Sequence, residues 1–103
     1  MSVDTDIVID EKIVQINKEP NKFNVVMLND NFTPIDWVVQ ILKTIYKHSQ
    51  ESAEKITLTI HNDGSAVVGT YAYEIAEQKA LETVNSSRTE GFPLQVKLEE
   101  AND

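Results

Sequence analysis

The spacing of hydrophobic and polar residues predicts a regular series of elements from residue 22 onward. Phe23–Leu28 is apolar on both faces, which is typical of a central β-strand. From Ile35 to Ile45 the apolar residues recur at helical spacing and form one broad face. A second helical pattern begins after Ser49, a good N-cap residue, and the Asn-Asp-Gly sequence at 62–64 ends it. The first half of the chain is therefore strand, helix, helix.

The second half predicts a strand, a helix and a final strand. Residues 66–70 (Ala-Val-Val-Gly-Thr) form the strand pattern, and Thr70 is the expected N-cap of the next helix. Gly91 and Pro93 end this helix, and residues 94–98 alternate as a half-buried strand does. The helix carries small residues on one side, which allow a close approach to a sheet, at Ala72, Ala76, Ala80 and Val84.

The element order is therefore β-α-α-β-α-β. Two helices between the first two strands return the chain antiparallel, and one helix between the second and third keeps those two strands codirectional. Placing the first strand in the middle makes every neighbouring pair antiparallel. We predict an α+β fold, a two-layer sandwich of a three-stranded antiparallel sheet and three helices. Residues 22–103 form this core domain, and residues 1–21 are expected to be an acidic, flexible N-terminal arm.

Short polar side chains are concentrated at the junction between the first strand and the first helix. Asn29, Asp30 and Asn31 follow the strand directly, and Thr33 is the expected helix N-cap, with Pro34 at the first helical position. An ordinary turn is the simplest interpretation, because Asn and Asp favour turns. The junction also points several hydrogen-bond acceptors toward an apolar helix face. That arrangement suits a ligand with a protonated amine and an apolar body.

His61 lies near the C-terminal end of the second predicted helix, where the helix dipole favours a protonated imidazole. The only other histidine is His48, and no spacing typical of a metal site occurs, so we expect no metal and no cofactor. The sequence has no nucleophile elbow, Gly-rich phosphate loop or nucleotide motif. A small hydrolase using His61 and Asp30 stays open as a remote alternative.

Composition narrows the class of protein further. With 103 residues, 41% of them hydrophobic, the chain suits one compact core. It carries 17 acidic against 9 basic residues, a net charge of −8, opposite in sign to most nucleic-acid binders. It has no cysteine for disulfides, no apolar run near the roughly 20 residues that cross a bilayer, and an acidic start unlike a signal peptide. We expect a cytoplasmic monomer that binds neither nucleic acid nor membranes.

Four segments form a series that matches a known family. They are Asn-Asp-x-x-Thr-Pro at 29–34, Leu-Thr-Ile-His at 58–61, Gly-x-Tyr followed by Glu-Ile-Ala-Glu-x-Lys at 69–79, and Gly-Phe-Pro-Leu at 91–94. In this order and spacing, over residues 22–99, they resemble the ClpS family of adaptors. These adaptors hand proteins to a AAA+ protease according to the N-terminal residue.

The resemblance implies a non-enzymatic adaptor that binds N-degron peptides and delivers them to a Clp protease. The α-amino group of the peptide would contact Asn29, Asn31 and His61. The first side chain, typically Phe, Tyr, Trp or Leu, would enter a hydrophobic pocket lined by Thr33, Ile35, Val38, Thr57, Ile60 and Leu94. Glu74 and Lys79 would dock on the N-terminal domain of the Clp AAA+ unfoldase, and the acidic arm would help to hand over cargo.

Three positions depart from the commonest family pattern. Asn31 replaces a second Asp, and Ile35 and Thr57 replace Met. Because Ile is stiff and Thr is short, we expect a pocket that favours flat aromatic rings over Leu. One further alternative stays open. The element order is similar to that of the C-terminal domain of the ribosomal stalk protein, which would make the chain a protein-interaction module without N-degron binding.

Overall fold

The computed structural model describes residues 21–101, so the predicted arm at 1–21 lies outside the described residues except for Asn21. The strands are β1 (Lys22–Leu28), β2 (Ser65–Ala72) and β3 (Gln95–Glu100). The helices are α2 (Ile35–Thr44), α3 (Gln50–Asp63) and α4 (Tyr73–Thr89). Pairing is antiparallel on both sides of β1, which gives the sheet order β2-β1-β3. The predicted fold class and the central position of the first strand are confirmed.

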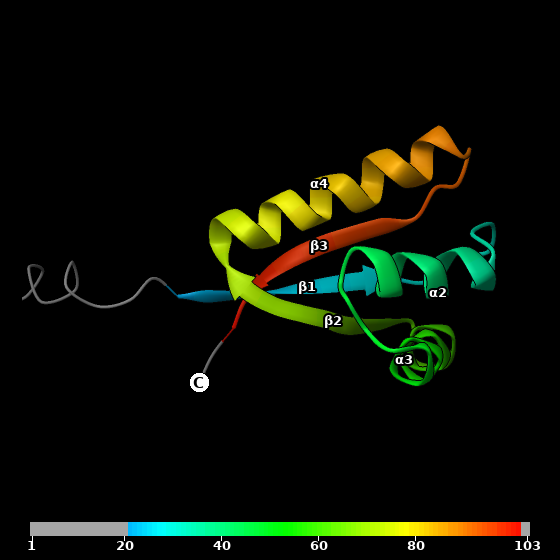
Figure 1. Ribbon diagram of the computed structural model, residues 1–103, viewed down its shortest axis with the longest axis horizontal. Helices are drawn as coiled ribbons and strands as arrows, with labels where there is room; N and C mark the ends of the chain where they lie inside the picture. The colour runs from blue at the N-terminus through cyan, green and yellow to red at the C-terminus, as the bar shows by residue number, and fades with distance from the viewer. Residues whose placement is uncertain (1–20, 102–103) are drawn as a thin grey trace, which may run out of the picture.

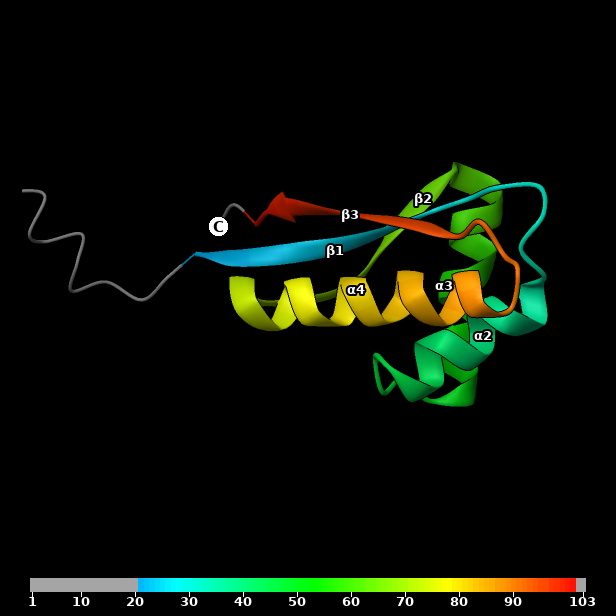
Figure 2. The same cartoon turned by 90° about the horizontal axis from the view of Figure 1, so that it is seen from above.

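Figure 1 shows β1 between β3 and β2, and Figure 2 shows α4 and α2 on the same side of this sheet. The view from above shows α3 starting beside α2 and ending at the level of the sheet, where β2 begins (Figure 2). Between the layers, Val25 and Met27 of β1 are fully buried. They pack in one core cluster with buried side chains from every helix, from β2 and from the residue before β3, among them Leu42, Ile60, Val68, Ala76 and Leu94.

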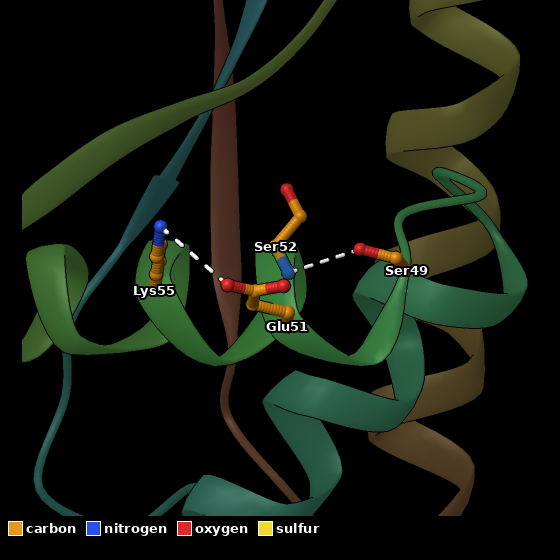
Figure 3. A network of polar contacts seen from close by, with 4 residues as sticks. All are labelled: Ser49, Glu51, Ser52 and Lys55. Atoms are coloured by element: carbon orange, nitrogen blue, oxygen red, sulfur yellow. Dashed lines mark hydrogen bonds and ion pairs between the residues drawn. The ribbon is translucent and has the colours of Figure 1, made fainter.

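Both predicted ends of α3 are confirmed. The Ser49 hydroxyl oxygen accepts a hydrogen bond from the backbone N–H of Ser52 at 3.1 Å, as an N-cap does (Figure 3). In the same view Lys55 faces Glu51 across one turn at 3.8 Å, an exposed pair that contributes little to stability. At the other end Gly64 takes a left-handed conformation (φ 94°) that glycine adopts at little cost, and it closes the helix.

The other two predicted N-caps, Thr33 and Thr70, are wrong. Pro34 occupies the N-cap position of α2 with no side-chain capping bond, and Thr33 bonds to Asp30 instead. Thr70 lies inside β2, which continues to Ala72, and its hydroxyl donates to the side-chain oxygen of Asn24 on β1 at 2.6 Å. Pairing with β1 keeps residues 70–72 extended, so α4 begins only after them.

A cluster of two tyrosines and a lysine joins α4 to α2 and β2. The Lys79 ammonium lies 5.3 Å from the ring centroid of Tyr71 and 6.0 Å from that of Tyr46. It also donates a hydrogen bond to the backbone carbonyl of Ile45, just past the end of α2, at 2.8 Å. The Tyr46 hydroxyl is 2.7 Å from that of Thr83 on α4. A cation at a helix C-terminus and over two aromatic faces stabilises this junction.

Replacing Gly69 by Ala tests this cluster. An added Cβ would lie 2.6 Å from the Cε2 and Cζ atoms of Tyr71, so the ring would have to leave its place beside Lys79. We expect Gly69→Ala to lower the free energy of unfolding by about 1–3 kcal/mol, the usual cost of overpacking. Urea and thermal unfolding measure the loss. In a Tyr71→Ala background the same change should cost much less, and an equal loss in both backgrounds would contradict the explanation.

Candidate functional site

One pocket opens where β1 ends, in the groove between α2 and α3. Its cavity measures about 220 Å³. The lining combines polar side chains from the loop after β1 and from the end of α3 with aliphatic side chains from the two helices: Asn29, Asp30, Asn31, Thr33, Ile35, Val38, Thr57, Ile60 and His61. Polar and apolar walls therefore meet in a single site.

A backbone hydrogen bond joins the two polar segments of the site. The N–H of Asn29 donates to the carbonyl of Gly64 at 2.9 Å, and Leu28 pairs with Ser65 next to it. Because Gly64 closes α3, this bond fixes the end of β1 to the end of α3. His61, in the last turn of α3, is thereby brought to the same pocket as the loop.

The Asp30 carboxylate organises the loop. One carboxylate oxygen accepts from the backbone N–H groups of Phe32 and Thr33, each at 2.7 Å, and the other accepts from the Thr33 hydroxyl at 2.8 Å. Burial raises the pKa of Asp30, but these hydrogen bonds and the positive charge of Arg88 outweigh it. The pKa therefore lies below its ordinary value of 3.8. Asp30 stays ionised at neutral pH and holds the loop in shape.

The remaining polar groups of the pocket can receive hydrogen bonds from a ligand. Thr33 gives its own hydroxyl proton to Asp30, so it offers lone pairs to the cavity. Asn29 and Asn31 are exposed and each has a carbonyl oxygen in the side chain. By contrast Thr57 donates its hydroxyl to the carbonyl of Ala53 at 2.7 Å and is 5% exposed. The loop side of the pocket is therefore rich in acceptors, whereas the Thr57 hydroxyl on the α3 wall is already engaged.

The structure brings together all the predicted peptide-site residues except Leu94. Leu94 is 1% exposed and packs in the core, and it is not among the residues that line the pocket. Asp30 also lines the pocket. The sequence placed it among the acceptors that follow the first strand, but not among the three residues predicted to contact the α-amino group. Its position between Asn29 and Asn31 was the available signal.

The two residues predicted for unfoldase docking lie away from the pocket, on α4. Glu74 is exposed in the first turn of that helix, between the exposed side chains of Tyr73 and Ile75. Lys79 is half-buried, because its ammonium is held by the cluster of Tyr46 and Tyr71. Of the pair, Glu74 is thus the one whose charged group is open to a partner.

Residues 21–101 contain no group of three or more His, Cys, Asp or Glu side chains arranged to hold a metal ion. None of the helices in this range is both long and apolar enough to span a membrane.

Comparison with known proteins identifies the family. Residues 18–97 match the family model of the ATP-dependent Clp protease adaptor protein ClpS. The chain belongs to the ClpS family. It is 41% identical over 92 residues to the ClpS adapter of Treponema denticola, and the matched stretch covers 89% of this chain and 87% of that protein. The ClpS adapter of Nautilia profundicola is 43% identical over 81 residues, covering 79% of this chain and 84% of the relative.

A solved ClpS structure shares the fold. The structure of Agrobacterium tumefaciens ClpS2 bound to L-phenylalaninamide matches with a TM-score of 0.78 at 35% identity, over 81% of this chain and all of that chain. As a ClpS protein the chain is an adaptor of the Clp protease and not an enzyme. The hydrolase alternative with His61 and Asp30 is therefore wrong, and so is the alternative of a ribosomal stalk-like module.

The lowered pKa of Asp30 gives a testable pH dependence. The hydrogen bonds to the ionised Asp30 carboxylate stabilise the folded loop above pH 3.8. This stabilisation is lost as the pH falls through the pKa of Asp30 in the folded state, which is lower than 3.8. We expect the amide NMR signals of Phe32 and Thr33 to shift with a midpoint below pH 3.8. In Thr33→Val, which lacks the hydroxyl donor, the midpoint should move up toward 3.8. A midpoint at or above that value in the unmodified protein would contradict the assignment.

Proposed function

We propose that this ClpS protein binds the free N-terminus of an N-degron polypeptide in the pocket at the end of β1. The α-amino group would contact Asn29, Asn31 and His61. The first side chain would lie against the other walls of the pocket, formed by Thr33, Ile35, Val38, Thr57 and Ile60. One observation carries the proposal: exposed acceptor side chains and an aliphatic wall line the same cavity.

The chemistry of the loop supports binding of a protonated amine. An ammonium group has three N–H donors and needs acceptors already held in place, since loose acceptors would have to be ordered on binding. The Asp30 carboxylate supplies a negative charge next to the cavity, and its bonds to Phe32 and Thr33 keep the loop rigid. The net charge of −8 also attracts a cationic terminus.

A relative's ligand supports the choice of an aromatic first residue. Agrobacterium tumefaciens ClpS2 binds L-phenylalaninamide, which has a free α-amino group and a single aromatic side chain. In the present pocket Ile35 is stiff at χ1 and Thr57 is short, so the cavity suits flat rings better than the branched Leu side chain. We therefore propose Phe, Tyr and Trp as preferred first residues, ahead of Leu.

We also propose that α4 docks the adaptor on the N-terminal domain of the Clp unfoldase, in the cytoplasm. Glu74 presents its carboxylate at the start of the helix, and Ala72, Tyr73 and Ile75 line an apolar hollow with it. Acidic and apolar groups side by side form a surface that suits a partner with complementary charge and exposed apolar groups. Lys79 supports this surface by fastening α4 to the end of α2.

Peptide binding tests the N-terminal site. A labelled Phe-initiated peptide should bind, and its N-acetylated copy should not, because acetylation removes the charge and two of the donors. His61→Ala should weaken binding of the free peptide by about 1.5–3 kcal/mol, which is more than tenfold. Its melting temperature should stay nearly unchanged, because His61 is exposed.

Fluorescence anisotropy measures both effects, and Asn62→Ala is the matched control. Asn62 is exposed beside His61 but does not line the pocket, so its removal should leave affinity intact. Equal binding of the free and acetylated peptides would refute the proposed site.

Unfoldase-dependent degradation tests the docking surface. Glu74→Ala should slow degradation of a Phe-initiated substrate and leave peptide affinity unchanged, because Glu74 lies outside the pocket. Glu82→Ala, another exposed acid on α4, serves as the control. Lys79→Ala is the poorer probe, because it also removes the bond to Ile45 and the contacts with two rings. Unchanged degradation with Glu74→Ala would exclude this carboxylate from docking.

A further inference from the structure

A second hollow adjoins the first in the groove between α2 and α3. It measures about 280 Å³ and is lined by Ile35, Val39, Glu54, Thr57 and Leu58. Ile35 and Thr57 line both hollows, so the two share a wall. The loop acceptors and His61 line only the first hollow. A ligand held by those groups therefore meets the second hollow only after passing the shared wall.

The shared wall is a ridge on the surface. The Ile35 side chain is 55% exposed, whereas Thr57, which also lines both hollows, is 5% exposed. Leu58, which lines the second hollow and not the first, is 59% exposed. Large aliphatic groups this exposed, gathered next to a binding pocket, are typical of a surface that another molecule covers.

We propose that the second hollow binds the third side chain of the same polypeptide whose N-terminus occupies the first pocket. This proposal rests on the proposed function. In an extended chain alternate side chains point to the same face, about 6.6–7 Å apart for residues i and i+2. When the first side chain fills one hollow, the second points to solvent and the third meets the protein across the ridge. The two hollows share the wall of Ile35 and Thr57, so they are neighbours, as the sites for the first and third side chains of an extended chain must be.

The lining defines which third residue is preferred. Ile35, Val39 and Leu58 supply aliphatic surface, and among residues 21–101 Glu54 alone brings a charge to the lining. One Glu54 carboxylate oxygen accepts from the Gln50 side-chain amide at 2.7 Å, which holds the charge in place. An aliphatic third residue buries apolar surface against this lining, whereas a third Asp or Glu meets a like charge. The substrate class is therefore an N-terminus with an aromatic first and an aliphatic third residue.

A peptide panel with Phe at the first position tests this specificity. Replacing Ala by Leu at the third position should tighten binding about fivefold to tenfold, as expected for a partly buried leucine. Glu at the third position should weaken binding, and the same changes at the second position should have little effect. Isothermal titration with the full chain measures these affinities, and the N-acetylated copy of each peptide is the control.

Two variants assign the effect to the second hollow. Leu58→Ala should abolish the gain from a third Leu and leave the affinity for Phe-Ala-Ala unchanged, because Leu58 does not line the first pocket. Leu81→Ala is the matched control, since Leu81 on α4 is similarly exposed at 57%. Glu54→Gln should remove the discrimination against a third Glu.

The outcomes separate this proposal from the one it rests on. If free and acetylated Phe-Ala-Ala bind equally, the N-terminal site itself is wrong. If binding needs the free amino group but is indifferent to the third residue, the second hollow is not part of the site. A preference at the second position, or a gain from a third Leu that survives Leu58→Ala, overturns the proposal as well.

Discussion

The hydrogen bond from the Asn29 N–H to the Gly64 carbonyl, next to the pairing of Leu28 with Ser65, is the contact on which the rest of the site depends. It joins the end of the central strand to the end of α3. It continues the pairing of β1 with β2, and together they hold the loop after β1 beside His61. Main-chain contacts at the end of a paired strand thus help to form one pocket from two segments that are distant in the sequence.

The polar groups of the pocket have two different roles: one holds the loop in shape, and the others are exposed to a ligand. The Asp30 carboxylate accepts hydrogen bonds from the backbone N–H groups of Phe32 and Thr33, so these two donors are already satisfied within the loop. Its neighbours Asn29 and Asn31 keep exposed side-chain carbonyls. A charged group that holds the loop, flanked by neutral groups that face solvent, lowers the cost of removing water when an ammonium binds.

The helix that provides much of the apolar wall, α2, is anchored to α4 at both ends. Near its start the indole N–H of Trp37 donates to the Ser87 hydroxyl at 2.9 Å, and just past its last turn Lys79 donates to the Ile45 carbonyl at 2.8 Å. The same α4 carries Glu74 in its first turn. The helix with the candidate docking surface and the helix of the pocket wall are therefore joined directly, by two partly buried hydrogen bonds.

Local pattern was enough to predict several features of this protein. The apolar run of β1, the Ser49 cap and the Gly64 stop depend on neighbouring residues, and they were predicted correctly. The family motifs identified an adaptor, because its characteristic residues lie in short segments whose order and spacing can be read along the chain.

Tertiary structure decided the rest. Pairing with β1 kept Thr70 in a strand, against its local preference as a helix cap. Packing between the layers put Leu94 in the core and turned the ammonium of Lys79 inward onto two rings. These outcomes depend on contacts between segments far apart in sequence. The assembled sheet and the helices packed on it determine which side chains remain free to meet a partner.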